Sequence, residues 1–190
     1  MNMLNFRYQL LFIWRLLDPI YYAFTRLNYI EDQQKKRQIF RVRLTKYKGK
    51  EVVLADGTVI SKNDMLVKIH LHNIRLLKEM IDIKSDLKKA RVIYQHVEHS
   101  LPCLADYIRK HPHYTEIKGI IGITLLAKGV HRLGFESVSI SNKWYERFKM
   151  LIAWPIYTLS VQKLSLQAFK KQRPKYLFMS KNQLLEKHAK

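Results

Sequence analysis

Apolar and polar side chains alternate along one stretch of the chain, residues 40–73. Successive side chains of a strand point to opposite faces, so this period of two predicts a strand at each end of the stretch. One face carries apolar side chains: Phe40, Val42, Leu44, Val67, Ile69 and Leu71. The other face is cationic or polar: Arg41, Arg43, Thr45, Lys68, His70 and His72.

Two turn signals separate these strands, one at residues 47–50 and one at Asp56-Gly57. The Asp-Gly dipeptide tolerates the positive φ that a tight hairpin requires. The pattern therefore predicts a small antiparallel sheet with one apolar face and one cationic, imidazole-bearing face.

The next part of the chain predicts further elements of an α+β fold. Three helices are expected, at 74–81, 85–99 and 102–110. A strand, a helix and a strand follow, at 117–123, 124–133 and 135–140, with Gly134 ending the helix. The two strands are parallel if they share a sheet. We therefore expect a small mixed sheet packed by helices, with a core domain at 31–141.

Large apolar and aromatic side chains gather at both ends of the chain. Residues 1–30 predict a helix that is apolar nearly all round and that Pro19 kinks or breaks. This helix either packs on the apolar face of the sheet or lies in a membrane interface, where its arginines reach the headgroups. A helix that is partly buried and partly lipid-facing fits the pattern equally well.

Residues 142–190 predict one or two aromatic helices and a basic tail. The tail, 161–190, carries eight Lys and Arg side chains against one acid, Glu186. A basic tail behind an aromatic apolar helix is typical of proteins that bind an anionic membrane surface, and a solvated, frayed terminus is the alternative. The candidate membrane-binding residues are Trp14, Arg15, Trp144, Trp154, Lys170, Lys171 and Arg173.

Composition narrows the partners. The 190 residues carry a formal net charge of +20, which indicates a polyanionic partner: an anionic membrane surface, an acidic polymer, or nucleic acid as the weaker alternative. The longest charge-free run, 150–162, is shorter than the roughly 20 apolar residues that span a bilayer. The single cysteine forms no intrachain disulfide. We expect a cytoplasmic protein held at the inner face of the membrane.

Catalytic chemistry, if present, would depend on His70. This imidazole would act as a general base oriented by Asp64, with Arg41 or Arg43 holding a phosphate group. His70 and His72 lack an obvious third ligand, so neither a metal nor another cofactor is expected. The chain also lacks the GxSxG, HExxH and P-loop motifs.

Two segments, 40–73 and IKGIIGITLLAKGVHRLGFE at 117–136, resemble the YkoP-like family of bacterial proteins, which occur alone or appended to polysaccharide-deacetylase-type proteins. The resemblance covers roughly residues 6–140. The matching positions are Asp56, Gly57, Thr58, Ile60, Asp64, His70, Leu71, Asn73, Gly122, Thr124, Gly129, Arg132, Leu133, Gly134 and Phe135. Asn63 departs from the glycine that the family tends to have, but asparagine also tolerates the left-handed conformation.

The resemblance implies an envelope-associated role and no particular activity. Because the chain lacks a deacetylase's paired Asp and His metal motif, we do not expect it to deacetylate. The leading hypothesis is an accessory or binding protein in envelope lipid or polysaccharide metabolism, with envelope biosynthesis or modification proteins as additional partners. Its proposed anion-binding residues, for a headgroup or phosphorylated glycan, are Arg41, Arg43, Lys68 and Asn73, beside His70. A small transferase or hydrolase using His70 and Asp64, and a nucleic-acid-binding protein, are the alternatives.

Overall fold

The computed structural model describes residues 25–125, 129–160 and 173–188, and before these positions 9, 12, 15, 16, 19 and 22. Between positions 154 and 160, only the side chain of Tyr157 is described.

Six strands in this part of the chain form one mixed sheet in the order β1-β2-β5-β6-β8-β7. They are β1 (Asn28–Glu31), β2 (Arg37–Lys46), β5 (Met65–Leu71), β6 (Ile117–Thr124), β8 (Lys175–Ser180) and β7 (Glu136–Ser139). Strands β5 and β6 pair in parallel, and all other neighbours pair antiparallel. The predicted α+β class with a small mixed sheet is therefore confirmed.

The alternating stretch forms the predicted hairpin. Strands β2 and β5 pair from Phe40 opposite Leu71 to Lys46 opposite Met65. Between them a second, two-stranded sheet joins β3 (Val52–Val53) to β4 (Val59–Ile60), and Gly57 in its turn has a φ of 80°. Glycine populates this conformation without a steric penalty, which explains why the Asp56-Gly57 signal was reliable.

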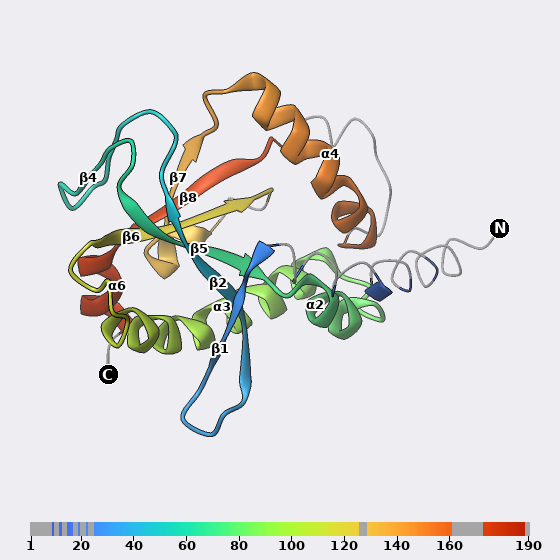
Figure 1. Cartoon of the computed structure of the whole chain (residues 1–190). Coiled ribbons are helices and arrows are strands. Elements are labelled where there is room, and N and C mark those ends of the chain that lie inside the picture. The colour runs from blue at the N-terminus through green and yellow to red at the C-terminus, as the bar shows by residue number, and fades with distance from the viewer. Residues whose placement is uncertain are drawn as a thin grey trace.

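Helices lie on both sides of the main sheet (Figure 1). Helices α3 (Asp86–Arg109) and α6 (Lys181–His188) cover the apolar face, while α4 (Lys143–Ser160) lies on the opposite side. Helix α2 (Asn73–Met80) follows β5 directly and contacts both α3 and α4. The main core, between the sheet and α3, includes Phe40, Val42, Val67, Leu101, Leu104, Ile108, Ile120 and Met179.

Helix α3 is continuous where two helices were predicted. Pro102 lies inside it, although proline lacks the N–H for the helical hydrogen bond and normally kinks or breaks a helix. Leu101, Leu104 and Ile108 are fully buried, so packing on the sheet offsets the lost bond. The Ser100 hydroxyl donates to the His96 carbonyl oxygen and accepts from the Ile39 N–H of β2, which ties the helix to the sheet at this point.

The predicted strand–helix–strand unit is partly confirmed. Strands β6 and β7 run in the same direction, because both pair antiparallel with β8. Residues 126–128 lie outside the described part. The rest of the predicted helix contains only a short 3-10 turn, η1 (Val130–Leu133), which Gly134 ends with a φ of 92°.

The prediction for the carboxyl end is wrong at β8. Residues 142–190 were expected to form helices and a basic tail, yet Lys175–Ser180 is a strand inserted between β6 and β7. Phe178 and Met179 are fully buried, one on each face of the sheet. A short apolar run that is covered on both faces does not alternate, so the period-two signal is absent here. Because β8 lies beyond residue 141, a division of the chain there would cut through this sheet.

The prediction for the amino end also differs in part. The helix expected over residues 1–30 gives way at Asn28 to β1, which pairs with β2 through Asn28 opposite Val42. Of the earlier positions, Phe12 and Leu16 are 61% and 59% exposed.

Candidate functional site

Strands β2 and β5 bring together four of the predicted site residues, which we call the cationic face: Arg41, Arg43, Lys68 and His70. The register places Arg41 directly opposite His70 and Arg43 directly opposite Lys68. Side chains so paired are about 5 Å apart at Cβ, and like charges in that position destabilise a sheet. The predicted alignment of these side chains on one face is confirmed, and the Arg43–Lys68 pair has an electrostatic cost.

Arg41 is tied into the protein. Its side chain is almost fully buried, and its Nη2 donates a hydrogen bond of 2.6 Å to the Tyr29 hydroxyl. The guanidinium carbon also lies 4.9 Å from the centre of the Tyr29 ring and 5.4 Å from that of Tyr22. Cation–π contacts of this kind hold the guanidinium in place. Arg41 therefore contributes charge to the cationic face rather than an open ligand-binding group.

Arg43 is more accessible. It is half-buried, and its Nη1 donates to the Thr25 carbonyl oxygen at 3.3 Å. Among the described groups, its Nε has no hydrogen-bond partner although it is buried. This buried N–H is therefore an unsatisfied donor among the described groups.

Lys149 of α4 joins these cations. Burial, with the charges of Lys149 and Arg43 acting in the same direction, lowers the pKa of Lys68 to about 8. Burial and the charge of Arg43 also lower the pKa of Lys149. The sequence analysis missed Lys149. Lys149 is a single lysine on the helix face opposite Trp144 and Leu151. Its position points to the sheet only once the outward face of α4 is known.

The proposed pair of His70 and Asp64 does not form. Asp64 lies just before β5, six residues from His70, which is roughly 20 Å along an extended strand. Its carboxylate accepts from the Ser61 N–H at 2.6 Å and pairs with Lys118 at 2.9 Å, and these contacts lower its pKa against the opposing effect of burial. Asp64 thus has a structural role in the β4–β5 turn.

His70 is poorly suited to act as a general base. Burial is the main cause that lowers its pKa to about 3. Four positive charges act in the same direction: Lys68, Arg43, Lys149 and Arg41. An effective general base has a pKa near the working pH, so His70 at neutral pH is an uncharged polar group at the base of the cationic face.

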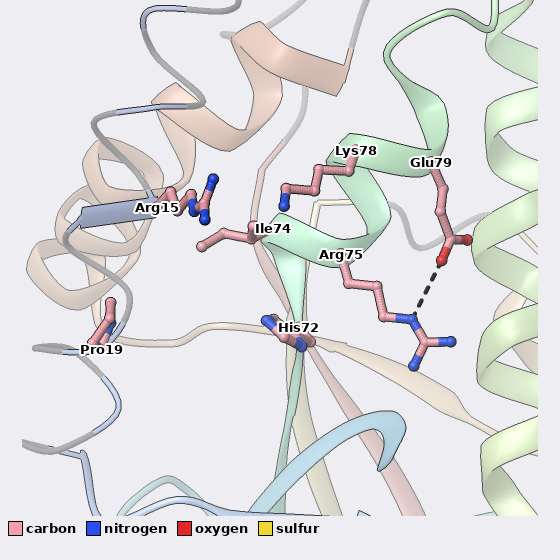
Figure 2. Close-up of a pocket in the computed structure, with 7 residues that line it drawn as sticks. All are labelled: Arg15, Pro19, His72, Ile74, Arg75, Lys78 and Glu79. Carbon is pink, nitrogen blue, oxygen red and sulfur yellow. Dashed lines mark hydrogen bonds and ion pairs between the residues drawn. The ribbon is translucent and has the colours of Figure 1, made fainter. Parts of the chain in front are cut away.

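A shallow hollow adjoins the cationic face where β5 meets α2 (Figure 2). It is lined by Arg15, Pro19, His72, Ile74, Arg75, Lys78 and Glu79. Glu79 neutralises part of this charge, because it pairs with Arg75 at 3.3 Å and with His96 at 2.5 Å. Asn73, a predicted anion-binding residue, begins α2 and is not among the residues that line the hollow.

The predicted membrane-binding residues have different positions. Trp144 on α4 is 80% exposed, and Arg15 is exposed at the edge of the hollow. Arg173 pairs with Glu146 of α4 at 3.4 Å, so its charge is partly compensated. Three candidates, Trp14, Lys170 and Lys171, lie outside the described residues, as does the side chain of Trp154.

The described residues offer neither a membrane-spanning helix nor a metal-binding cluster. No helix in these ranges is both long enough and apolar enough to cross a bilayer. Nor do these residues include three or more His, Cys, Asp or Glu side chains grouped so as to hold a metal ion.

Comparison with known proteins identifies relatives. The family model described as "YkoP domain" matches residues 7–188, nearly the whole chain. The chain belongs to the YkoP-like family. It is 51% identical over 178 residues to the Bacillus subtilis (strain 168) protein named "Uncharacterized protein YkoP", covering 94% of this chain and 95% of that relative. No solved structure matches the chain.

Proposed function

We propose that this YkoP-like protein is a basic peripheral membrane protein that binds anionic lipid surfaces through the outer face of α4. This face consists of Trp144, Phe148, Leu151 and Ile152, which follow the helical spacing i, i+4, i+7 and i+8. The main support is that α4 exposes apolar side chains and buries a charged one, the opposite of an ordinary surface helix. Trp144 and Leu151 are 80% and 72% exposed, whereas Glu146 on the inward side is 7% exposed.

The charge around this face favours an anionic bilayer as the occupant. Lys143 and Arg147 are exposed beside the outer face, and the Arg147 guanidinium lies 5.8 Å from the Trp144 ring. Tryptophan suits the headgroup level of a membrane, and each cation near an anionic leaflet contributes about 1 kcal/mol. The net charge of +20 adds long-range attraction to the same surface.

An accessory or binding role at the envelope membrane fits these features better than catalysis does. His70 and Asp64, the residues of the enzyme hypothesis, are at opposite ends of β5 and make no pair. The inner leaflet is the surface that we propose, since its anionic lipids complement the protein's charge. There the protein would support lipid or polysaccharide metabolism by recognising anionic headgroups or phosphorylated precursors.

Vesicle flotation with charge-insertion variants tests the proposal. Wild-type protein should float with phosphatidylglycerol–phosphatidylcholine vesicles and much less with phosphatidylcholine alone. Burial of a leucine side chain is worth about 2 kcal/mol, so Leu151→Glu should weaken flotation by roughly tenfold or more. Leu87→Glu is the matched control, because Leu87 is 77% exposed on α3, which lies across the sheet from α4.

Four outcomes would contradict membrane docking through α4 or its electrostatic part. Equal flotation of wild type on neutral and anionic vesicles would remove the electrostatic contribution. Equal loss in both variants would show that the outer face of α4 has no special role. Dimerisation in solution that Leu151→Glu abolishes would mean that a second copy covers this face. Duplex DNA that displaces the protein from vesicles at matched phosphate concentration would favour the nucleic-acid alternative.

A further inference from the structure

The cationic face points to the side of the sheet on which α4, the helix that we propose to dock on lipid, lies (Figure 1). Arg43 and Lys68 face each other across β2 and β5. Helix α4 lies on one side of the sheet (Figure 1), and its Lys149 is close enough for its charge to lower the pKa of Lys68. All three are half-buried, so they are accessible to a small solute while being partly shielded from water. Cations from three elements therefore lie close enough to act on one another.

Within the described part of the chain, none of these three cations has a carboxylate partner. The acid nearest in sequence on α4, Glu146, pairs instead with Lys143 and Arg173, each at 3.4 Å. Lys149 lies over two rings, 5.1 Å from the centre of Tyr145 and 5.8 Å from that of Phe148. Like charges at such close quarters oppose folding unless an anion is bound between them.

We propose that Arg43, Lys68 and Lys149 form a phosphate-binding site between the sheet and α4. Lysine and arginine side chains are donors only, so together they match an oxyanion that accepts hydrogen bonds on every oxygen. A phosphate monoester carries up to two negative charges on three such oxygens, which suits three converging cations better than a singly charged carboxylate does. Arg41 adds a fourth charge from a fixed position, and its contacts with Tyr29 keep the rear of the site rigid.

This phosphate group has two sources, a soluble phosphorylated compound or the headgroup of a lipid. The site itself rests on the geometry of β2, β5 and α4. Only the lipid source rests on the membrane docking proposed above. The two proposals therefore fail separately.

Calorimetric titration of the full chain with inorganic phosphate, at constant ionic strength held with chloride, tests the site. Wild type should bind phosphate, and Lys68→Met with Lys149→Met should weaken that binding by about tenfold or more, because two charge-assisted contacts are lost. Lys46→Met is the matched control: Lys46 is an exposed lysine at the end of β2, and its loss should leave phosphate binding unchanged. Heat equal to that of a chloride titration, or equal loss in the control, would overturn the proposal.

Flotation then separates the two sources. Phosphatidic acid carries a phosphate monoester, and phosphatidylglycerol carries a diester. If the source is a lipid, wild type should prefer vesicles with phosphatidic acid over vesicles of equal charge made with phosphatidylglycerol. The double variant should lose this preference but still float. Phosphate binding without that preference assigns the site to a soluble compound. Leu151→Glu should weaken flotation as above and leave phosphate binding intact. Flotation of wild type without phosphate binding would overturn the phosphate site while membrane docking stands.

Discussion

Replacement of Lys68 by methionine should stabilise the free protein at neutral pH. Burial first, and then Lys149 and Arg43, lower the pKa of Lys68 from 10.5 to about 8. One pKa unit corresponds to about 1.4 kcal/mol, so the protonated Lys68 side chain costs the folded state roughly 3 kcal/mol at pH 7. Methionine keeps the apolar stem without the charge. The expected gain in the free energy of unfolding is therefore positive, with an upper limit of about 3 kcal/mol.

Urea unfolding followed by circular dichroism measures this gain. Wild type and Lys68→Met are compared at pH 7 in chloride buffer, with Lys46→Met as the exposed control, for which a change within about 0.5 kcal/mol is expected. Added phosphate should raise the stability of wild type more than that of Lys68→Met, because only a native state that binds the anion gains from it. A Lys68→Met protein no more stable than wild type at pH 7 would refute the electrostatic reasoning.

The sign of the pH dependence gives an independent check. Between pH 8 and 10.5 the folded protein loses the Lys68 proton while the unfolded chain still holds it. At this residue the unfolded state then binds more protons, so the contribution of Lys68 to stability rises with pH across this range. Lys149 contributes in the same direction, and Arg43 and the neutral His70 face both lysines without changing charge there. Lys68→Met combined with Lys149→Met should flatten the rise.

Three further predictions concern other parts of the fold. The pKa of His70 is lowered from 6.5 to about 3, so wild type should lose stability as pH falls through this range. His70→Asn should lose less stability, and an identical dependence of unfolding free energy on pH in both proteins would contradict the burial of His70. Gly119→Ala should lower the free energy of unfolding, measured in urea, by at least about 2 kcal/mol, since its Cβ would lie 2.5 Å from the Met179 carbonyl oxygen. No change in this free energy would mean that β6 and β8 can separate. Ser180→Ala should cost about 1–2 kcal/mol, because the hydroxyl accepts from the Gln183 N–H at the start of α6 and donates to Asp56, and the exposed Ser139→Ala on β7 serves as its control.

Local patterns in the sequence were enough to predict the central hairpin. Phe40, Arg41 and Val42 alternate between the two faces of β2, because successive side chains of a strand point to opposite faces of the sheet. Gly57 and Gly134 mark turns at positions whose φ values only glycine adopts readily. The close match of the candidate cationic face to the structure follows from this local geometry.

The surroundings of that face depended on contacts distant in sequence. Alternation cannot tell which face meets solvent, and α4 with the Tyr22 and Tyr29 rings covers the face that the charges had suggested was open. The separation of His70 from Asp64 likewise follows from the length of β5 rather than from the kinds of residue involved.

The sequence by itself determined the elements with a local cause: the paired strands, the tight turns and the excess of positive charge. Only the tertiary structure decided that β8 enters the sheet between β6 and β7, that α3 continues through Pro102, and that Lys149 joins Arg43 and Lys68. The physical reason is that apolar surfaces are buried between segments far apart in the sequence. The free energy of this burial can exceed both the local helix or strand propensity and the repulsion of like charges.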